Sequence, residues 1–425
     1  MLNIWTVSSI IGVYLITLFV IAFLGERRLK DNRQHPILYS LGLGVHCTSW
    51  AFFGTTSQAA EYGWAIVPTY MGIMLTMAFA FPVVLHISRL CQRHNITSLA
   101  DLIGLKYNHS HLVAAFITLL CFIGVIPYIA LQLDAITKSI GLIAPSVPST
   151  NQNVSIYVAA LMAIFAIVFG TRRLNLIDKH PGLLLTIAFE SLFKLIALWT
   201  VGVFVCFFMF DGVLDLVAKA SSNKAASNVI YADSAPLVYL THVMLGICSM
   251  FVLPRQFHMN FVELNGEGEL RTARWLFPMY LLGMTVFLIP LALAGKMLLP
   301  DAINSDTYVL ALPIYANNVE VSIIAFLGGL SATTSMVIVA TLALGIMIAN
   351  NVVTPLWIKA RLRTEPNHTM HPGKILAIRR LTVLVVLSVA LWYHLNVSQA
   401  APLVKSGIIA IALLSQSLPV LMFGL

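Results

Sequence analysis

Charged residues are scarce in this sequence: aspartate, glutamate, lysine and arginine together make up 10% of its 425 residues. A soluble domain carries about 25% charged and about 45–50% apolar residues. Here 59% of the residues are apolar and the mean hydropathy is +0.88. The composition therefore excludes a soluble enzyme and indicates a protein that lies mostly within a lipid bilayer.

Sequence motifs for disulfides, metal binding and phosphoryl transfer are also missing. The five cysteines are widely spaced and form no CxxC or Cys/His pattern: Cys47, Cys91, Cys121, Cys206 and Cys248. The sequence contains no ATP-binding or phosphoacceptor module. We therefore expect no enzymatic activity, no metal site other than one for Na⁺, and no cofactor other than a coupling cation.

The net charge of +8 does not indicate nucleic-acid binding. Basic residues lie in short clusters between apolar runs, whereas a nucleic-acid site would need them on one water-exposed face. Nucleic acid is therefore excluded as a partner.

Eleven apolar runs are long enough to cross a bilayer core, which requires ~20 residues. They cover residues 4–24, 37–60, 64–88, 111–141, 153–171, 181–210, 236–256, 276–299, 319–350, 375–397 and 401–425. The connecting stretches are short, so the sequence predicts one transmembrane domain over residues 1–425. If residue 1 lies outside the cell, every arginine falls in or beside a cytoplasmic loop, as the positive-inside rule requires. We therefore predict an outside N-terminus.

The second and seventh runs have an unusual composition for lipid-facing helices. The second contains His46 among many Gly, Ser and Thr residues, and the seventh contains His242 and Pro254. Helices interrupted at matching places in two halves indicate a transporter's binding site. Small residues can instead let helices pack closely, and this alternative stays open.

These two runs are five apart, which predicts an inverted repeat. Residues 1–36 then form an extra helix and the first inside loop, residues 37–210 the first repeat, and residues 236–425 the second. An odd number of spans per repeat inverts the second relative to the first.

Ionisable side chains within the runs are candidates for function because each is costly in lipid. Glu190 and Lys194 are four residues apart, which predicts a mutually neutralising pair with a structural role. Asp134 can pair with Lys138 in the same way. His46 lies at the centre of the second run, where an imidazole could bind substrate or carry a proton.

The ninth run contains a cluster of hydroxyl residues: Ser331, Thr333, Thr334 and Ser335. Their hydroxyls can bond carbonyls of their own helix four residues earlier. They are also oxygen ligands suited to a small cation, and spacing alone does not decide between the two roles.

Several stretches together resemble the sodium/solute symporter family. GVHCTSWAFFGTTSQA is similar to the family's first core helix, FLGGLSATTSM to its sodium-binding helix and SLPVLMFGL to its final core helix. FGTRRLN, HPGLLLTIAFESLFKL, FVLPRQFHMNFVE and SDTYVLALP more specifically resemble the transporter-like input domains of bacterial sensor histidine kinases. The resemblance implies an all-α integral membrane protein with a leucine-transporter-type 5+5 inverted repeat, one extra N-terminal helix and about eleven transmembrane helices.

The resemblance also implies a function in the bacterial inner membrane. One expectation is symport of a small polar solute with Na⁺ or H⁺ by alternating access. An amino acid such as histidine or proline is the first candidate solute, and a short carboxylate such as acetate is the second. The alternative is a ligand-sensing input domain of a two-component system, whose partners would be a kinase module or a response regulator.

The family's site residues map onto this sequence as follows. Substrate-lining positions fall on His46, Trp50, Gln132, Gly246, Met250, Pro254 and Gln416. The sodium site falls on carbonyls of Gly44, Cys47 and Gly328 and on the Ser331 hydroxyl. The second hydroxyl ligand of the family falls on Ala332, and the position of His46 is acidic in proline-transporting members, so protons remain an alternative to sodium. Because Leu425 lies within an apolar run, we expect the chain to be a fragment or one part of a split protein.

Overall fold

The computed structural model describes residues 2–29, 33–145, 152–170, 180–232, 235–361, 372–397 and 403–423, and all regular structure in these ranges is helical. Arg172 and Arg173, which contribute to the predicted orientation, lie outside the described residues. The fold expected from the sequence, an all-helical membrane protein, is confirmed.

The N-terminal half is ordered along the chain as follows. It contains α1 (Ile4–Arg28), α2 (Pro36–Gly42), η1 (Leu43–His46), η2 (Trp50–Gly54), α3 (Thr55–Tyr62), η3 (Gly63–Ile66), α4 (Val67–Phe79), α5 (Phe81–Arg93), α6 (Leu99–Lys106), α7 (His111–Ile143), α8 (Gln152–Gly170), α9 (Pro181–Phe204), η4 (Val205–Met209), α10 (Val213–Ser222) and α11 (Lys224–Ile230).

The C-terminal half repeats this pattern of long and interrupted helices. It contains α12 (Pro236–Val252), α13 (Pro254–Phe257), η5 (His258–Val262), α14 (Glu267–Thr285), α15 (Leu288–Leu298), η6 (Ser305–Thr307), α16 (Tyr308–Tyr315), α17 (Val319–Ile348), η7 (Ala349–Val353), α18 (Thr354–Arg361), α19 (Pro372–Asn396), α20 (Leu403–Ser415) and α21 (Ser417–Phe423).

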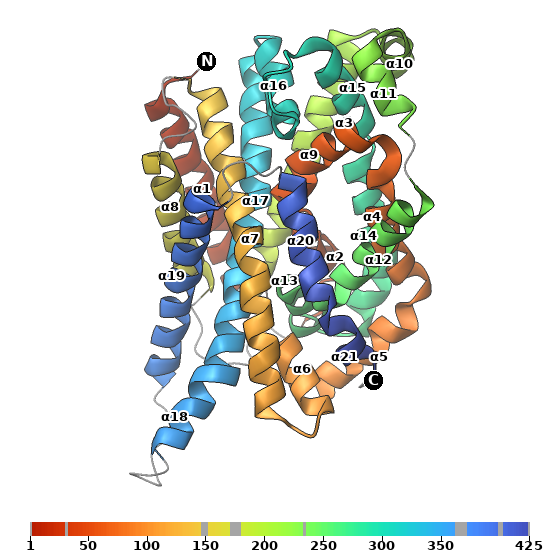
Figure 1. Cartoon of the computed structure of the whole chain (residues 1–425). Coiled ribbons are helices and arrows are strands. Elements are labelled where there is room, and N and C mark those ends of the chain that lie inside the picture. The colour runs from red at the N-terminus through yellow and green to blue at the C-terminus, as the bar shows by residue number, and fades with distance from the viewer. Residues whose placement is uncertain are drawn as a thin grey trace.

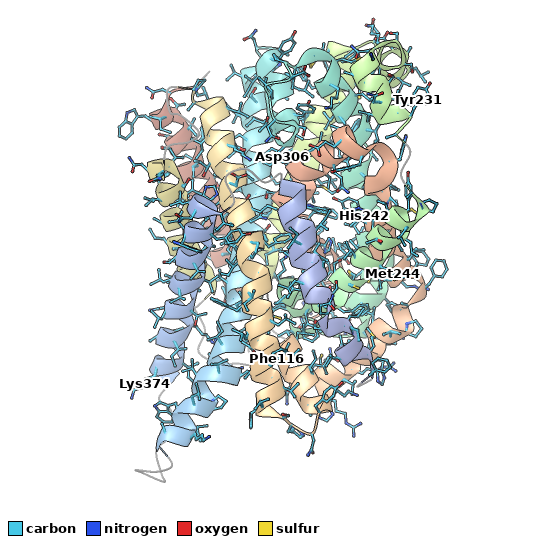
Figure 2. The ribbon with its side chains drawn as sticks, viewed as in Figure 1. Phe116, Tyr231, His242, Met244, Asp306 and Lys374 are labelled. Carbon is cyan, nitrogen blue, oxygen red and sulfur yellow. The ribbon has the colours of Figure 1, made fainter. Side chains whose placement is uncertain are left out.

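Six helices of the described chain are long and apolar enough to cross a membrane, and two bent pairs, α4 with α5 and α12 with α13–η5, bring this to eight. The other predicted spans correspond to shorter pieces, α2–α3, α8 and α20–α21. The number eleven therefore remains a prediction. Large apolar side chains lie exposed on the outside, as lipid contact requires; Phe116 is 65% and Met244 50% exposed (Figure 2).

Local sequence explains where several helices begin. Asn3, Ser110 and Asn318 accept hydrogen bonds from backbone N–H groups in the first turns of α1, α7 and α17. Proline stands at the first position of α2, α9 and α12, where its missing N–H leaves no intrahelical bond unmade.

Helix α17 forms the centre of the molecule. Almost every residue from Ala325 to Met347 is buried, whichever way its side chain points. Such an all-round apolar helix is expected in a core, and α17 contacts α7, α8, α9 and α19. Figure 1 shows α7 and α20 crossing in front of this core.

The two ends of the molecule carry different connections. The N-terminus lies at the same end as α10, α11 and α16, whereas α6 and α18 lie at the other end (Figure 1). Residues 211–235 were predicted to share a side with the N-terminus, and this is confirmed. Which side of the membrane that end faces remains a prediction.

Candidate functional site

The first helix interruption lies between α2 and α3. A 3₁₀ turn at η1 ends in Cys47, whose backbone is extended (φ −80°, ψ 92°), and the chain resumes helical form at η2. Because the bilayer offers no water to unpaired amides, other groups must satisfy this backbone. The Ser49 N–H donates to Oε1 of Gln132 on α7 at 3.2 Å, and the Trp50 N–H donates to the Thr48 hydroxyl at 3.2 Å.

The second interruption separates α12 from α13. Leu253 is extended (φ −73°, ψ 118°), as expected for a residue that precedes proline, and the two segments meet at 57°. Asn260 Nδ2 donates to the Met250 carbonyl at 2.9 Å. The Tyr39 hydroxyl of α2 in turn donates to the Asn260 carbonyl at 2.7 Å, which joins the two interrupted helices.

Both interruptions predicted from the sequence are therefore confirmed, but the predicted substrate residues divide into two groups. His46, Trp50, Met250 and Pro254 are buried at one break or the other. Gln132 supports the backbone of the first break. Gly246 and Gln416 lie elsewhere, and their substrate roles remain untested predictions.

Gly246 packs α12 against α4, and Gln416 is exposed between α20 and α21. A Cβ atom on Gly246 would lie 2.2 Å from the Thr69 carbonyl oxygen, so this glycine allows the backbones to approach closely. Gln416 Nε2 donates to the Ala412 carbonyl of its own helix at 3.3 Å.

Buried polar atoms without a hydrogen-bond partner in the described chain gather at the two breaks. They are His46 Nδ1, Ser49 Oγ, Trp50 Nε1, Thr56 Oγ1, Tyr70 Oη, Arg255 Nε and Gln256 Oε1. Buried polar groups are rarely left unpaired because each costs about 1–3 kcal/mol. The concentration of such atoms at helix breaks is typical of a site that binds a polar ligand.

The predicted ion site is engaged by side chains and backbone of α9. Lys194 Nζ donates to the Cys47 carbonyl at 2.6 Å, and Ser331 Oγ donates to the Glu190 carbonyl at 2.8 Å. Thus a protein ammonium group lies on one predicted sodium ligand, and a second predicted ligand bonds to α9. Gly44 accepts the Cys47 N–H, and Gly328 packs against Ala197 and Phe52.

The ion pair predicted between Glu190 and Lys194 is wrong for the described structure. Lys194 turns to Cys47, and Glu190 Oε1 instead accepts hydrogen bonds from Thr334 and, at 3.4 Å, from Tyr14. The two side chains reach different neighbours because the break in the second span exposes a carbonyl that Lys194 satisfies.

The other polar residues within spans have local partners. Thr333, Thr334 and Ser335 bond carbonyls of α17 four residues earlier, which is the structural role left open from the sequence. Asp134 and Lys138 form the predicted pair at 2.7 Å. His242, labelled in Figure 2, bonds the Thr69 hydroxyl at 2.8 Å and thereby ties α12 to α4.

A second cluster joins the two repeats beyond the end of the bent pair α12–η5. Oε1 of Glu263 lies 3.0 Å from His180 Nδ1 and 3.2 Å from His258 Nε2, and all three residues are buried. These ligand-type atoms lie within 4.8 Å of one another, an arrangement that could hold a metal ion. Sequence analysis missed the cluster because its residues are far apart along the chain.

Hydrogen bonding governs the protonation of this carboxyl group. Burial alone would raise the pKa of Glu263, but hydrogen bonds from His180 and His258 outweigh burial and hold it well below its usual range. The carboxylate is therefore ionised at neutral pH and links the start of α9 to η5.

Glu263→Gln is expected to lower the free energy of unfolding by about 3 kcal/mol, because it removes one partner from a buried charged network. A depressed pKa gives stability that is present above the usual carboxyl pKa and is lost as pH falls through the folded-state value. The deficit, measured by thermal unfolding in detergent, should therefore persist between about pH 5 and pH 8. The matched control is Glu267→Gln in the exposed pair with Arg89, which should cost less than about 1 kcal/mol. A Glu263 deficit that closes by pH 5 would contradict this account.

A separate pocket of about 740 Å³ lies on the face of α9, remote from both breaks in sequence and lined by Leu195, Ile196, Trp199, Thr200, Val203, Phe204, Phe208, Asn318 and Val321. Its lining is almost wholly apolar, so it suits hydrocarbon rather than a polar solute.

Comparison with known proteins supports the fold. No protein-family model and no curated protein sequence matches the chain. Among solved structures, the chain is similar to a Na⁺-coupled sialic acid symporter in a substrate-bound, outward-open state. The TM-score is 0.69 at 12% identity, over 93% of this chain and 82% of the other. The leucine-transporter-type arrangement inferred from the sequence is thereby confirmed.

Proposed function

We propose that this chain is a multi-pass transporter of the bacterial inner membrane that couples entry of a small polar solute to a cation by alternating access. The main support is the set of unpaired buried polar atoms at the two interrupted helices. A transporter fold with polar groups at mid-membrane breaks is the arrangement that secondary transporters use to bind solutes. The similar solved structure is described as a Na⁺-coupled symporter, which agrees with this proposal.

The position of Lys194 favours a proton as the coupling cation. Its ammonium group lies 2.6 Å from the carbonyl of Cys47, a predicted sodium ligand. A sodium ion at that carbonyl would have to displace the ammonium group, whereas a proton needs only the amine itself. An amine at this position can bind and release a proton as the site opens to each side.

Uptake by purified protein in liposomes tests the proposal. Labelled L-histidine, L-proline and acetate are each supplied at two pH values, with and without an inward Na⁺ gradient. Accumulation above the outside concentration, driven by an inward proton gradient, is expected. Solute binding without accumulation would instead support the receptor function, and accumulation driven only by Na⁺ would overturn proton coupling.

Trp50→Ala is expected to weaken solute binding about tenfold, which corresponds to about 1.4 kcal/mol. The indole is buried at the first break, its Nε1 has no partner in the described chain, and its ring lies 6.5 Å from that of Tyr70. The matched control is Trp275→Ala on α14, whose side chain is 64% exposed. Binding and thermal stability are measured on the same samples. An equal loss of both in Trp50→Ala would mean that the indole only supports the fold.

A further inference from the structure

Arg255 is a buried charge at the second helix break that the sequence-based site did not include. It follows Pro254 directly, belongs to α13 and is 2% exposed. α13 contacts η1, which carries His46. A buried guanidinium is costly unless an anion or several hydrogen bonds compensate it.

The described chain supplies little compensation. The guanidinium carbon lies 4.3 Å from the centre of the Tyr128 ring, and Tyr128 in turn bonds Thr48 of the first break at 3.1 Å. Arg255 Nε has no hydrogen-bond partner, and none of the ion pairs among the described residues includes Arg255. An aromatic face attracts a cation but does not neutralise it.

The charges around the breaks do not balance. Arg255 and Lys194 both act electrostatically on His46 and Cys47, so two cations lie near the first break. Glu190 is the carboxylate close to Lys194, and it is held by Thr334 and Tyr14. Other buried carboxylates are engaged elsewhere: Asp134 with Lys138, Glu263 with two histidines, and Glu269 with the N–H groups of His35 and Asn265. The site therefore has an excess of positive charge.

We propose that Arg255 binds the carboxylate of the transported solute, which makes the substrates carboxylic acids in their anionic form. A guanidinium can donate two parallel hydrogen bonds to a carboxylate, a geometry that also fixes the orientation of the solute. The rest of the solute then faces the unpaired polar atoms of His46 and Gln256 next to Arg255. This inference rests on the proposed transport function but specifies the class of solute and the residue that selects it.

Ligand-induced thermal stabilisation of the purified chain tests this assignment. The probes are L-proline, L-histidine and acetate, each compared with its neutral amide. The carboxylates, and not the amides, should raise the unfolding temperature. Arg255→Gln should weaken the apparent affinity at least about 30-fold, because one partner of a buried charged pair is removed. Arg255→Lys, which keeps the charge but loses the planar donor pair, should give an intermediate loss.

Arg379→Gln is the matched control. Arg379 is also buried, at 3% exposure, but it lies on α19, which contacts α7, α8 and α17 rather than the second break. Its loss should leave the carboxylate response unchanged. Equal stabilisation by amides, an unchanged response in Arg255→Gln, or no response to any carboxylate would overturn the assignment.

Two further arms separate the assignment from its alternatives. The measurements are repeated in chloride and in methanesulfonate salts, since chloride could also neutralise Arg255. Stabilisation by chloride that depends on Arg255, with nothing added by carboxylates, would overturn the solute assignment. In the liposome assay, gradient-driven accumulation of an uncharged sugar would leave symport standing and refute the role of Arg255. Arg255-dependent binding of a carboxylate without accumulation would support the role and refute symport.

Discussion

Lys194→Met is expected to abolish the uptake driven by a proton gradient, with a fall of at least about tenfold in the initial rate. The ammonium group is the cation at the first helix break, where it donates to the Cys47 carbonyl at 2.6 Å. Methionine has a similar length but binds no proton. Without a titratable amine, the state of the break cannot depend on the proton gradient, and only downhill solute flux should remain.

Lys194→Arg separates the effect of charge from that of proton release. Arginine remains protonated at all accessible pH values, so this variant should bind solute yet fail to respond to the gradient. Lys219→Met is the control, because Lys219 lies exposed on α10 in a pair with Asp215. If Lys194→Met retained full proton-driven uptake, Lys194 would have no part in coupling.

Gly72→Val is expected to prevent stable packing of α4 against α12, with a loss of more than about 3 kcal/mol. A Cβ atom on Gly72 would lie 2.1 Å from the Val243 carbonyl oxygen and 3.0 Å from the Ile247 nitrogen. Both neighbours are backbone atoms, so they cannot rotate away as a side chain can. The variant should show a lower yield of monodisperse protein and a lower unfolding temperature.

Gly12→Val provides the matched control for that substitution. A Cβ atom on Gly12 of α1 meets nothing within 4 Å, so valine there should fold as the parent does. Comparable stability of Gly72→Val and Gly12→Val would show that the α4–α12 approach is looser than the structure indicates.

The sequence predicts the helix breaks well because their causes are local. Proline at position 254 removes a backbone N–H and forces Leu253 into an extended form, whatever the surroundings. The apolar runs likewise mark the long helices, because bilayer thickness sets their length.

Side-chain partners at the site depend on the tertiary fold, and there the sequence was less informative. The spacing of Glu190 and Lys194 favours a pair on an isolated helix, but the break in the second span provides a stronger partner for Lys194 from another element. Arg255 looked like a charge at a cytoplasmic loop edge, because a linear sequence cannot show that α13 packs against η1. Gly246 looked like a substrate position, yet its neighbour is the backbone of α4.

A density map of the full chain prepared with a solute that stabilises it tests the central claim most directly. The account predicts density for one solute molecule between η1 and α13, with its carboxylate at the Arg255 guanidinium and both helices interrupted. Solute density at any other place, or α2–α3 and α12–α13 each running as a continuous helix, would contradict it.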